Sequence, residues 1–372
     1  MSLPTVFALS AALHLYIALR LVTALPVAGG IALALVLLAS AALVPSGLLA
    51  RRLLRPPAAD RLTWVGMLFM GLFSSLLVLT VLRDLVLLAA HLAGVASPAL
   101  AEDTAAAAPL LALALSAVGF VNARRPARVR RVTVPLADLP DALAGFRIVQ
   151  ISDIHVGPTI KHEYLQAIVD RVNALDADVV AITGDLVDGS VAELRAHVAP
   201  LALLRARHGV YFVTGNHEYY SGVHGWVDEL QRLGIRVLHN EHVVLRHEGA
   251  HLVLAGVTDY TGHHFDEAHR SDPAAALAGA PDGAPRVLLA HQPRSAPAAQ
   301  AAGFDLQLSG HTHGGQFLPW TFFVPLQQPY TAGLHQLGRL SIYVSRGTGY
   351  WGPPKRIGAP SEIAELLLAA SA

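Results

Sequence analysis

The pattern of hydrophobic and polar positions divides the chain into two parts of different character. Up to about residue 123, Leu, Ala and Val dominate and charged residues are rare. This part contains four long apolar runs, at about residues 5–25, 27–50, 62–93 and 105–122. Each run approaches or exceeds the ~20 residues with which a helix crosses the hydrocarbon core of a bilayer. The pattern predicts a transmembrane region of four helices over residues 1–123. The first run lacks a preceding basic segment and an obvious cleavage site, so we expect it to be retained as a helix rather than removed as a signal peptide.

After residue 145 the pattern changes to short β-branched runs that alternate with amphipathic stretches of helical length. The runs predict strands at 146–155, 178–185, 209–218, 286–292 and 304–315. Helices are predicted at 161–174 and 191–207, a hairpin at 243–247 and 251–257, and closing strands at 338–346 and 362–369. This succession indicates an α/β fold, a two-sheet α/β sandwich over residues 146–372. Residues 124–145 are then a basic juxtamembrane linker.

The net formal charge of zero hides an asymmetry between the two parts. Residues 1–131 contain 11 Arg and 4 Asp or Glu, giving +7, whereas residues 132–372 contain 16 Lys or Arg and 23 Asp or Glu, giving −7. An acidic globular domain repels polyanions, which disfavours nucleic acid as a substrate. The chain has no Cys, so a metal site would use His, Asp and Asn ligands.

The charges between the apolar runs predict how the chain crosses the membrane. Arg clusters stand between the second and third runs and after the fourth, whereas the loop between the third and fourth runs carries only Glu102 and Asp103. The positive-inside rule places both Arg clusters on the cytoplasmic face, so we expect both termini and the globular domain on the cytoplasmic side. Arg83 and Asp84 interrupt the third run, and two interpretations stay open: contact with a lipid headgroup, or a contact between helices where this long helix emerges.

The five β-branched runs share one feature: each has Asp, Asn or His at its C-terminal end, followed by Gly or another residue typical of loops. In chain order the candidates are Asp153, His155, Asp185, Asn216, His217, His291, His311 and His313. Sites in α/β sheets lie at the carboxyl ends of the strands, so we expect these side chains to meet. Mixed oxygen and nitrogen ligands favour Mn, Fe, Zn or Co over Mg or Ca. Two such ions about 3.5–4 Å apart would generate hydroxide, withdraw charge from a phosphoryl group and stabilise the leaving oxygen.

The candidates fall into five ordered blocks, Asp153-Ile154-His155, Gly184-Asp185, Gly215-Asn216-His217-Glu218, His291 and Gly310-His311-Thr312-His313. Over about residues 146–369 the sequence resembles the calcineurin-like metallophosphoesterases, whose motifs occur in this order. The segment GHTHGGQ at 310–316 is most similar to their bacterial membrane-anchored branch with N-terminal transmembrane helices. This resemblance implies that the membrane is a bacterial inner membrane. The resemblance implies that one ion is held by Asp153, His155 and His313, that a second is held by Asn216, His291 and His311, and that Asp185 bridges both. It also implies that His217 binds no metal and faces the phosphate.

These features lead to one main hypothesis. It is a dinuclear metal-dependent phosphoesterase, acting as phosphodiesterase, pyrophosphatase or phosphatase, that uses a metal-bridging hydroxide on a lipid-linked or membrane-proximal substrate. Its catalytic residues are His217 and Asp185, and its substrate contacts are Asn216, His217, His263 and His264. The alternative is a catalytically silent membrane scaffold or sensor with the same fold. A channel or transporter is disfavoured because polar residues are sparse in the apolar runs.

Two acidic residues near the blocks have alternative interpretations. Asp188 either orients a metal-binding histidine or caps a turn. Glu218 either orients His217 or is a solvated surface residue. The turn at Arg346 to Gly349 and the side chain of Arg356 either contact an anionic group of the substrate or close the fold.

Overall fold

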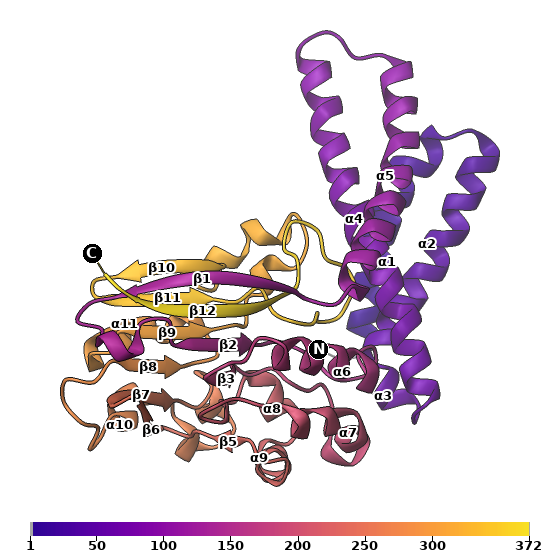
Figure 1. The fold of residues 1–372 in the computed structure, drawn as a ribbon. Coiled ribbons are helices and arrows are strands. Elements are labelled where there is room, and N and C mark those ends of the chain that lie inside the picture. The colour runs from indigo at the N-terminus through magenta and orange to yellow at the C-terminus, as the bar shows by residue number, and fades with distance from the viewer. Residues whose placement is uncertain (1–2, 372) are drawn as a thin grey trace. The chain divides into compact units, whose positions relative to one another are not determined.

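The computed structural model describes residues 3–371, which form two compact units (Figure 1). One is helical and comprises residues 3–124 together with Gly352–Ile357. The other is an α/β unit that comprises Arg125–Trp351 and residues 358–371.

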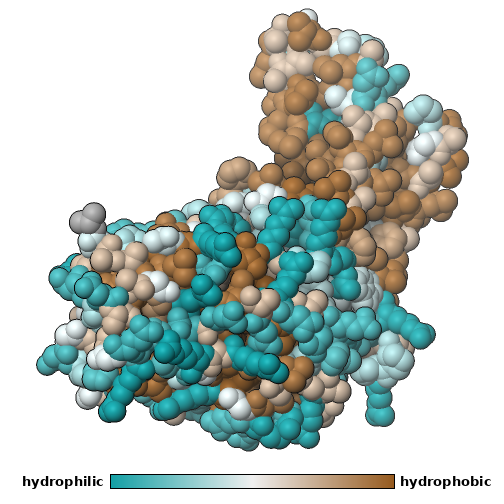
Figure 2. Space-filling view, in the orientation of Figure 1, coloured by the Kyte–Doolittle hydropathy of each residue, from teal (hydrophilic) through white to brown (hydrophobic). Residues whose placement is uncertain are grey.

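The helical unit contains the four predicted membrane helices. They are α1 (Leu3–Leu21, continued by the 3-10 turn η1, Val22–Ala24), α2 (Val27–Leu48), α4 (Ala58–Leu92) and α5 (Pro98–Arg124), with a short α3 (Ala50–Leu53) between the second and the third. All four are long and apolar enough to cross a membrane. Their outer surface is mostly hydrophobic (Figure 2). The prediction of a four-helix membrane region is confirmed.

Small residues allow close contact between these helices. A Cβ on Gly66 would lie 2.6 Å from Cα of Gly47, so α2 and α4 touch backbone to backbone. The two charged residues of the third run also pair within the helical unit. Asp84 accepts a hydrogen bond from Tyr16 (2.7 Å) and forms an ion pair with Arg20 (2.8 Å), and Arg83 donates to the carbonyl of Ala101 (2.9 Å). Of the two interpretations of this charged pair, the structure favours the contact between helices.

The α/β unit consists of two six-stranded mixed sheets. The first has the order β1 (Arg128–Leu136), β12 (Glu362–Ala370), β2 (Arg147–Ile151), β3 (Val179–Ile182), β4 (Val210–Phe212) and β5 (Arg236–Val237). The second has the order β10 (Gly333–Leu337), β11 (Leu340–Val344), β9 (Leu306–Ser309), β8 (Arg286–Leu289), β7 (Ala250–Gly256) and β6 (Glu241–His247). Strands β2 to β5 are parallel to one another, as are β11, β9, β8 and β7.

Helices connect these strands. They are α6 (His162–Asn173), α7 (Val191–Val198), α8 (Asn216–Ser221), α9 (Val223–Arg232), α10 (Pro273–Ala276) and α11 (Ala296–Ala302). Between the sheets lies one hydrophobic core, which joins Ile148 and Ala181 of the first sheet to Leu254, Leu289 and Leu308 of the second. Side chains alternate between the faces of a strand, so every second residue of these runs faces this core. The predicted two-sheet sandwich is confirmed.

The segment predicted as a basic linker contains a strand. Residues Arg128–Leu136 form β1, which lies parallel to β12 at the edge of the first sheet. Arginines obscured the alternating pattern of this strand. One of them, Arg131, pairs with the buried carboxylate of Glu365 on β12 (2.6 Å). Charged residues are common on edge strands, where one side of the backbone meets solvent.

Candidate metal centre

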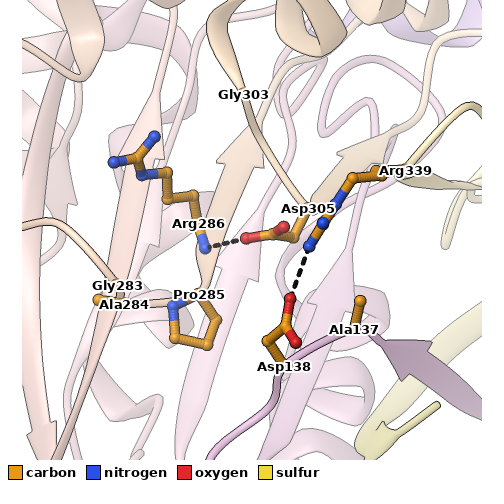
Figure 3. A pocket seen from close by; sticks show the side chains of 9 residues that line it. All are labelled: Ala137, Asp138, Gly283, Ala284, Pro285, Arg286, Gly303, Asp305 and Arg339. Atoms are coloured by element: carbon orange, nitrogen blue, oxygen red, sulfur yellow. Dashed lines mark hydrogen bonds and ion pairs between the residues drawn. The ribbon is translucent and has the colours of Figure 1, made fainter.

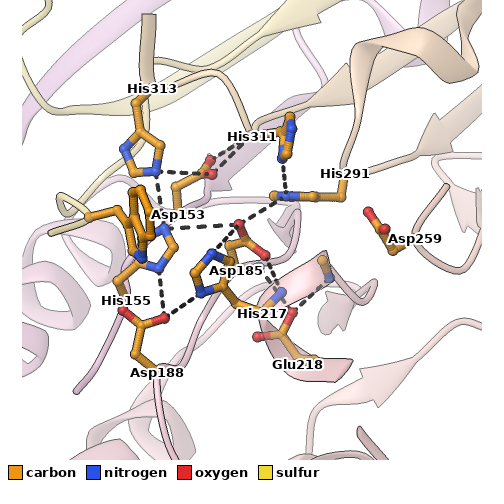
Figure 4. Close-up of polar contacts among 12 residues, drawn as sticks. Asp153, His155, Asp185, Asp188, His217, Glu218, Asp259, His291, His311 and His313 are labelled. Carbon is orange, nitrogen blue, oxygen red and sulfur yellow. Dashed lines mark hydrogen bonds and ion pairs between the residues drawn. The ribbon is translucent and has the colours of Figure 1, made fainter. Parts of the chain in front are cut away.

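Five strand ends deliver the candidate ligands to one place (Figure 4). Asp153 and His155 follow β2, and Asp185 follows β3. Asn216, which begins α8, follows β4. His291 follows β8, and the pair His311 and His313 follows β9. The site thus joins the carboxyl ends of parallel strands from both sheets.

The ligand atoms form two groups. In the first, Asp153, His155 and His313 each offer an atom within 4.8 Å of the others, and the Nε2 atoms of the two histidines are 3.0 Å apart. The second group consists of Asp185, His291 and His311. Here Nε2 of His291 lies 3.2 Å from both Oδ2 of Asp185 and Nδ1 of His311. Asp185 Oδ2 is also 4.0 Å from Nε2 of His155, so this carboxylate stands between the groups.

These residues fit divalent cations by three observations. Imidazole nitrogens that face each other at 3.0 Å point two lone pairs at one location, which a cation between them would satisfy. Oδ1 of Asn216 is buried and accepts no hydrogen bond from the described residues. Asp153 and Asp185 are both buried, at 0% and 3% exposure, and two carboxylates at such depth require nearby positive charge. The donors are all nitrogen and oxygen, as in sites for Mn, Fe, Zn or Co.

The backbone at the ligands is strained. Five of the seven candidates have positive φ: Asp153 (53°), His155 (57°), Asp185 (51°), His311 (69°) and His313 (51°). Left-handed backbone is rare for residues other than Gly and costs about 1–3 kcal/mol where the surroundings impose it. Such strain clusters at functional sites, and here it aims alternate side chains of the Asp-x-His and His-x-His blocks inward.

Burial also selects the protonation state of a ligand. Desolvation and the neighbouring His291 lower the pKa of His311 to about 3, so its ring is neutral at physiological pH. A neutral imidazole has a free lone pair, which is the form that binds metal. For Asp153, burial followed by the charge of Asp185 opposes ionisation, and the pKa of this carboxyl is raised.

Asp188 contacts both His155, a candidate metal ligand, and His217, the candidate catalytic residue. Its Oδ1 lies 2.6 Å from Nδ1 of His217 and 3.1 Å from Nδ1 of His155. Burial alone would lower the pKa of His217, but the hydrogen bond to Asp188 and the charges of Asp185, Asp188 and Glu218 raise it to about 9. This carboxylate therefore orients two histidines, and His217 is a cation at neutral pH.

Glu218 is fully buried and acts on the backbone. Its carboxylate accepts hydrogen bonds from the N–H groups of Asp185 (3.0 Å), Leu186 (2.8 Å), Val187 (3.3 Å) and Gly215 (2.7 Å). It holds together the turns after β3 and β4. The interpretation of Glu218 as a solvated residue is wrong, and its contacts are with main chain rather than with the ring of His217.

The remaining candidates lie elsewhere. His263 and His264 belong to the 3-10 turn Gly262–His264, where their rings contact each other (4.0 Å), and neither is in a ligand group formed by residues 3–371. The turn at Arg346 closes the fold. Its Arg346 pairs with Glu362 (3.2 Å), and N–H of Gly349 donates to the carbonyl of Asp153 (3.1 Å).

Two aromatic residues beside the site escaped the sequence analysis. The rings of Trp351 and Tyr220 contact His217 edge-on, at centroid distances of 5.6 and 5.3 Å. Both side chains are exposed, by 52% and 63%. Trp351 is distant in sequence from every block, and Tyr220 lies just beyond the end of one block, so no motif includes either residue.

A second concave site lies at the opposite strand ends. Arg286 begins β8, Asp305 precedes β9 and Arg339 precedes β11. There N–H of Arg286 donates to Asp305, and Arg339 pairs with Asp138 (Figure 3). These charges satisfy one another, so this pocket carries no functional assignment.

Comparisons with known proteins show which family this chain resembles in sequence. Residues 146–315 match the family described as Calcineurin-like phosphoesterase. "Transmembrane protein with metallophosphoesterase domain" of Bos taurus is 43% identical over 283 residues, which are 72% of this chain and 62% of that protein. An "Uncharacterized metallophosphoesterase" of Aquifex aeolicus is 33% identical over 240 residues, covering 63% of this chain and 89% of that protein. A solved structure of the NAD nucleotidase of Haemophilus influenzae aligns with a TM-score of 0.39 and 17% identity, over 60% of this chain and 56% of that one.

The relatives differ from this chain in length and come from varied organisms. This chain spans less than two thirds of the length of the bovine relative. The relatives come from animals as well as bacteria, so they do not assign it to the bacterial branch. The matched region contains all the candidate ligands, and four apolar helices precede it. The chain belongs to the calcineurin-like metallophosphoesterase family and is a membrane-anchored member of it.

Proposed function

We propose that this protein hydrolyses a phosphoester, phosphodiester or pyrophosphate bond in a lipid-linked or membrane-proximal substrate. The observation that supports the proposal is the meeting of six Asp and His donors from four strand ends in two adjoining groups. At a fifth strand end, Oδ1 of Asn216 is buried and accepts no hydrogen bond from the described residues. In this assignment Asp153, His155 and His313 would hold one divalent ion, Asn216, His291 and His311 would hold a second, and Asp185 would be a ligand of both. Such ions supply a water-derived nucleophile near neutral pH and withdraw charge from the phosphoryl oxygens.

The protein's own residues act around that centre. The imidazolium of His217, held by Asp188, would bind a phosphoryl oxygen and donate a proton to the leaving oxygen as the ester bond breaks. The backbone N–H of His217 donates to Oδ1 of Asp185 (2.9 Å), which keeps this bridging carboxylate in place. Glu218 fixes both turns from behind. A water-derived oxygen would attack phosphorus directly, with no side chain as nucleophile, so no covalent phosphoenzyme would form.

The membrane part indicates where the reaction occurs. The Arg clusters next to the spans support a topology with both termini and the α/β unit in the cytoplasm, at the inner membrane if the chain is bacterial. His263 and His264 would then contact the distal part of a substrate longer than a single phosphate.

Asp185→Asn provides the test of the proposed function. Full-length protein reconstituted in nanodiscs with Mn²⁺ should hydrolyse bis(p-nitrophenyl) phosphate at least about 100-fold faster than this variant. Asp282→Asn is the matched control, because this side chain is fully exposed and pairs with the surface residue Arg286. Elemental analysis should find two divalent ions per wild-type chain. Equal rates for wild type and Asp185→Asn would favour the silent scaffold.

A further inference from the structure

A long apolar segment follows the last ligand block. Residues 318–326 read LPWTFFVPL, and no Asp, Glu, Lys or Arg occurs between Asp305 and Arg339. Its large side chains are exposed: Leu318 by 49%, Trp320 by 42%, Phe322 by 73%, Phe323 by 51% and Leu326 by 80%. We call these five residues, together with Trp351, the apolar rim. An exposed group of this size and composition is typical of an interaction surface.

Short-range contacts attach the apolar rim to the ligand block. Oγ1 of Thr321 donates to the carbonyl of Gly314 (2.9 Å), and Oγ1 of Thr312 donates to the carbonyl of Thr331 (2.6 Å). Gly315 has φ of 80°, and a Cβ there would lie 2.3 Å from Cα of Thr321. These contacts attach the segment, and the residues that follow it, to the turn that contains His311 and His313.

Trp351 links the rim to the catalytic group. Its backbone N–H donates to Oε1 of Gln316, and its carbonyl accepts from Nε2 of the same residue, both at 2.9 Å. Its ring lies against His217. Apolar surface thus begins beside the residue that faces the phosphate in the proposed function.

The chain connects this rim and the α/β unit to the helical unit through short segments. Three residues separate the end of α5 at Arg124 from the start of β1 at Arg128, a reach of about 10–14 Å. Trp351 is followed immediately by Gly352–Ile357, which belongs to the helical unit. In that unit Nζ of Lys355 donates to the carbonyl of Gly71 (2.8 Å) and to Oγ of Ser75 (2.5 Å). The last rim residue is therefore joined to a segment that the membrane helices hold.

We propose that the apolar rim lies in the boundary between headgroups and acyl chains, and that a lipid's phosphate enters the metal centre there while its acyl chains stay in the membrane. Trp and Phe prefer this boundary, where their rings are half-desolvated. The occupant of the rim is thus membrane lipid. The second half of the proposal, lipid entry, rests on the proposed function, whereas the first half does not.

Trp320 reports on the rim without any enzyme assay. Full-length protein in nanodiscs would be compared with Trp320→Phe, using lipids brominated near the headgroup as quenchers. The chain has four Trp, and the difference between the two proteins isolates Trp320. We expect bromolipid to reduce this difference signal at least twofold, whereas Trp226, which is 1% exposed, is unaffected. If bromolipid leaves the fluorescence difference between the two proteins unchanged, the proposal is wrong. A signal that changes only with protein concentration assigns the rim to a second copy of the chain and also overturns it.

A double variant tests lipid entry. Phe322→Ser combined with Leu326→Ser removes two side chains that are mostly exposed, so the fold should be unaffected. We expect at least a tenfold loss of kcat/KM on phosphatidylglycerol or phosphatidic acid in nanodiscs, and less than a twofold change on bis(p-nitrophenyl) phosphate. Leu203→Ser, which is 50% exposed elsewhere on the α/β unit, is the control. Equal losses on both substrates, or a wild type that cleaves only the soluble ester, overturn lipid entry. If neither substrate is cleaved, the proposed function fails while bromolipid quenching still decides the position of the rim.

Discussion

Asp188→Asn should move the alkaline limb of the pH–rate profile to lower pH. The pKa of His217 is raised from 6.5 to about 9, and the hydrogen bond to Asp188 at 2.6 Å is the largest cause of the rise. At 1.36 kcal/mol per pKa unit, this difference is a preference for the imidazolium of roughly 3 kcal/mol. Asp185 and Glu218 contribute part of it, so loss of the Asp188 charge should remove about half or more, which is one to two pH units.

The sign of the effect follows from linkage. A histidine whose pKa is raised by folding stabilises the folded state fully below pH ~6.5, and this contribution is lost as pH rises through about 9. The imidazolium of His217 is present over the same range of pH. In wild type, activity that needs the His217 imidazolium should persist to about pH 9. In Asp188→Asn it should decline from about pH 7 to 8, giving roughly a two- to tenfold lower kcat at pH 8 and little change at pH 6.

The assay is hydrolysis of bis(p-nitrophenyl) phosphate from pH 5 to 10 by reconstituted protein at saturating Mn²⁺. Asp266→Asn is the control, because Asp266 also lies beside histidines, His224 and His269, but outside the centre. An alkaline limb that stays in place in Asp188→Asn would refute the argument. A limb that moves when Co²⁺ replaces Mn²⁺, yet not with Asp188→Asn, would assign the titration to a group at the ions.

Three further predictions separate binding from chemistry and probe the packing. His311→Ala should reduce the metal content from two ions to about one per chain, whereas His217→Ala should keep both ions and lower kcat about 10²–10⁴-fold, as elemental analysis and initial rates will show. Gly215→Ala should abolish metal binding and activity, because the new Cβ would lie 2.3 Å from Oδ1 of Asp185, whereas Gly225→Ala, whose Cβ would meet Val191 at an ordinary 3.6 Å, should leave both unchanged. Gly66→Leu should lower the thermal stability of the detergent-solubilised protein by separating α2 from α4, whereas Gly29→Leu, whose Cβ would meet Leu25 at 4.0 Å, should not.

Much of the fold follows from local pattern. Apolar length alone locates the membrane helices, because lipid requires a continuous apolar surface over each span. The central strands β2, β3, β8 and β9 are buried on both faces and read as apolar runs that end at a ligand. The edge strand β1, by contrast, could not be predicted from its local pattern. Its Arg130 and Arg131 pair with Glu362 and Glu365 of β12, contacts that a local stretch of sequence does not reveal.

The same division applies to the site. The ligands are predictable because each occupies a strand end within a recognisable block. The roles of Asp188 and Glu218 depend on contacts with residues about 30 positions away in the chain, so a turn cap and a solvated acid remained open alternatives. The rim aromatic Trp351 contacts His217 across more than a hundred residues, and no sequence pattern records that contact.

Because of their positive φ angles, the Asp-x-His and His-x-His blocks need neighbouring residues that hold their backbone in place. A left-handed residue at Asp153 or His155 is unfavourable in isolation, and it persists only where the surroundings define it. Here the N–H groups of Asp153 and His155 donate to the carbonyls of Gly184 and Asp185, so the turn after β3 holds the turn after β2. Glu218 holds the turn after β3 by accepting hydrogen bonds from its N–H groups. Glu218, which binds no metal in the proposed assignment, therefore supports both ligand turns. Its loss should displace Asp153 and His155, with which its carboxylate makes no hydrogen bond.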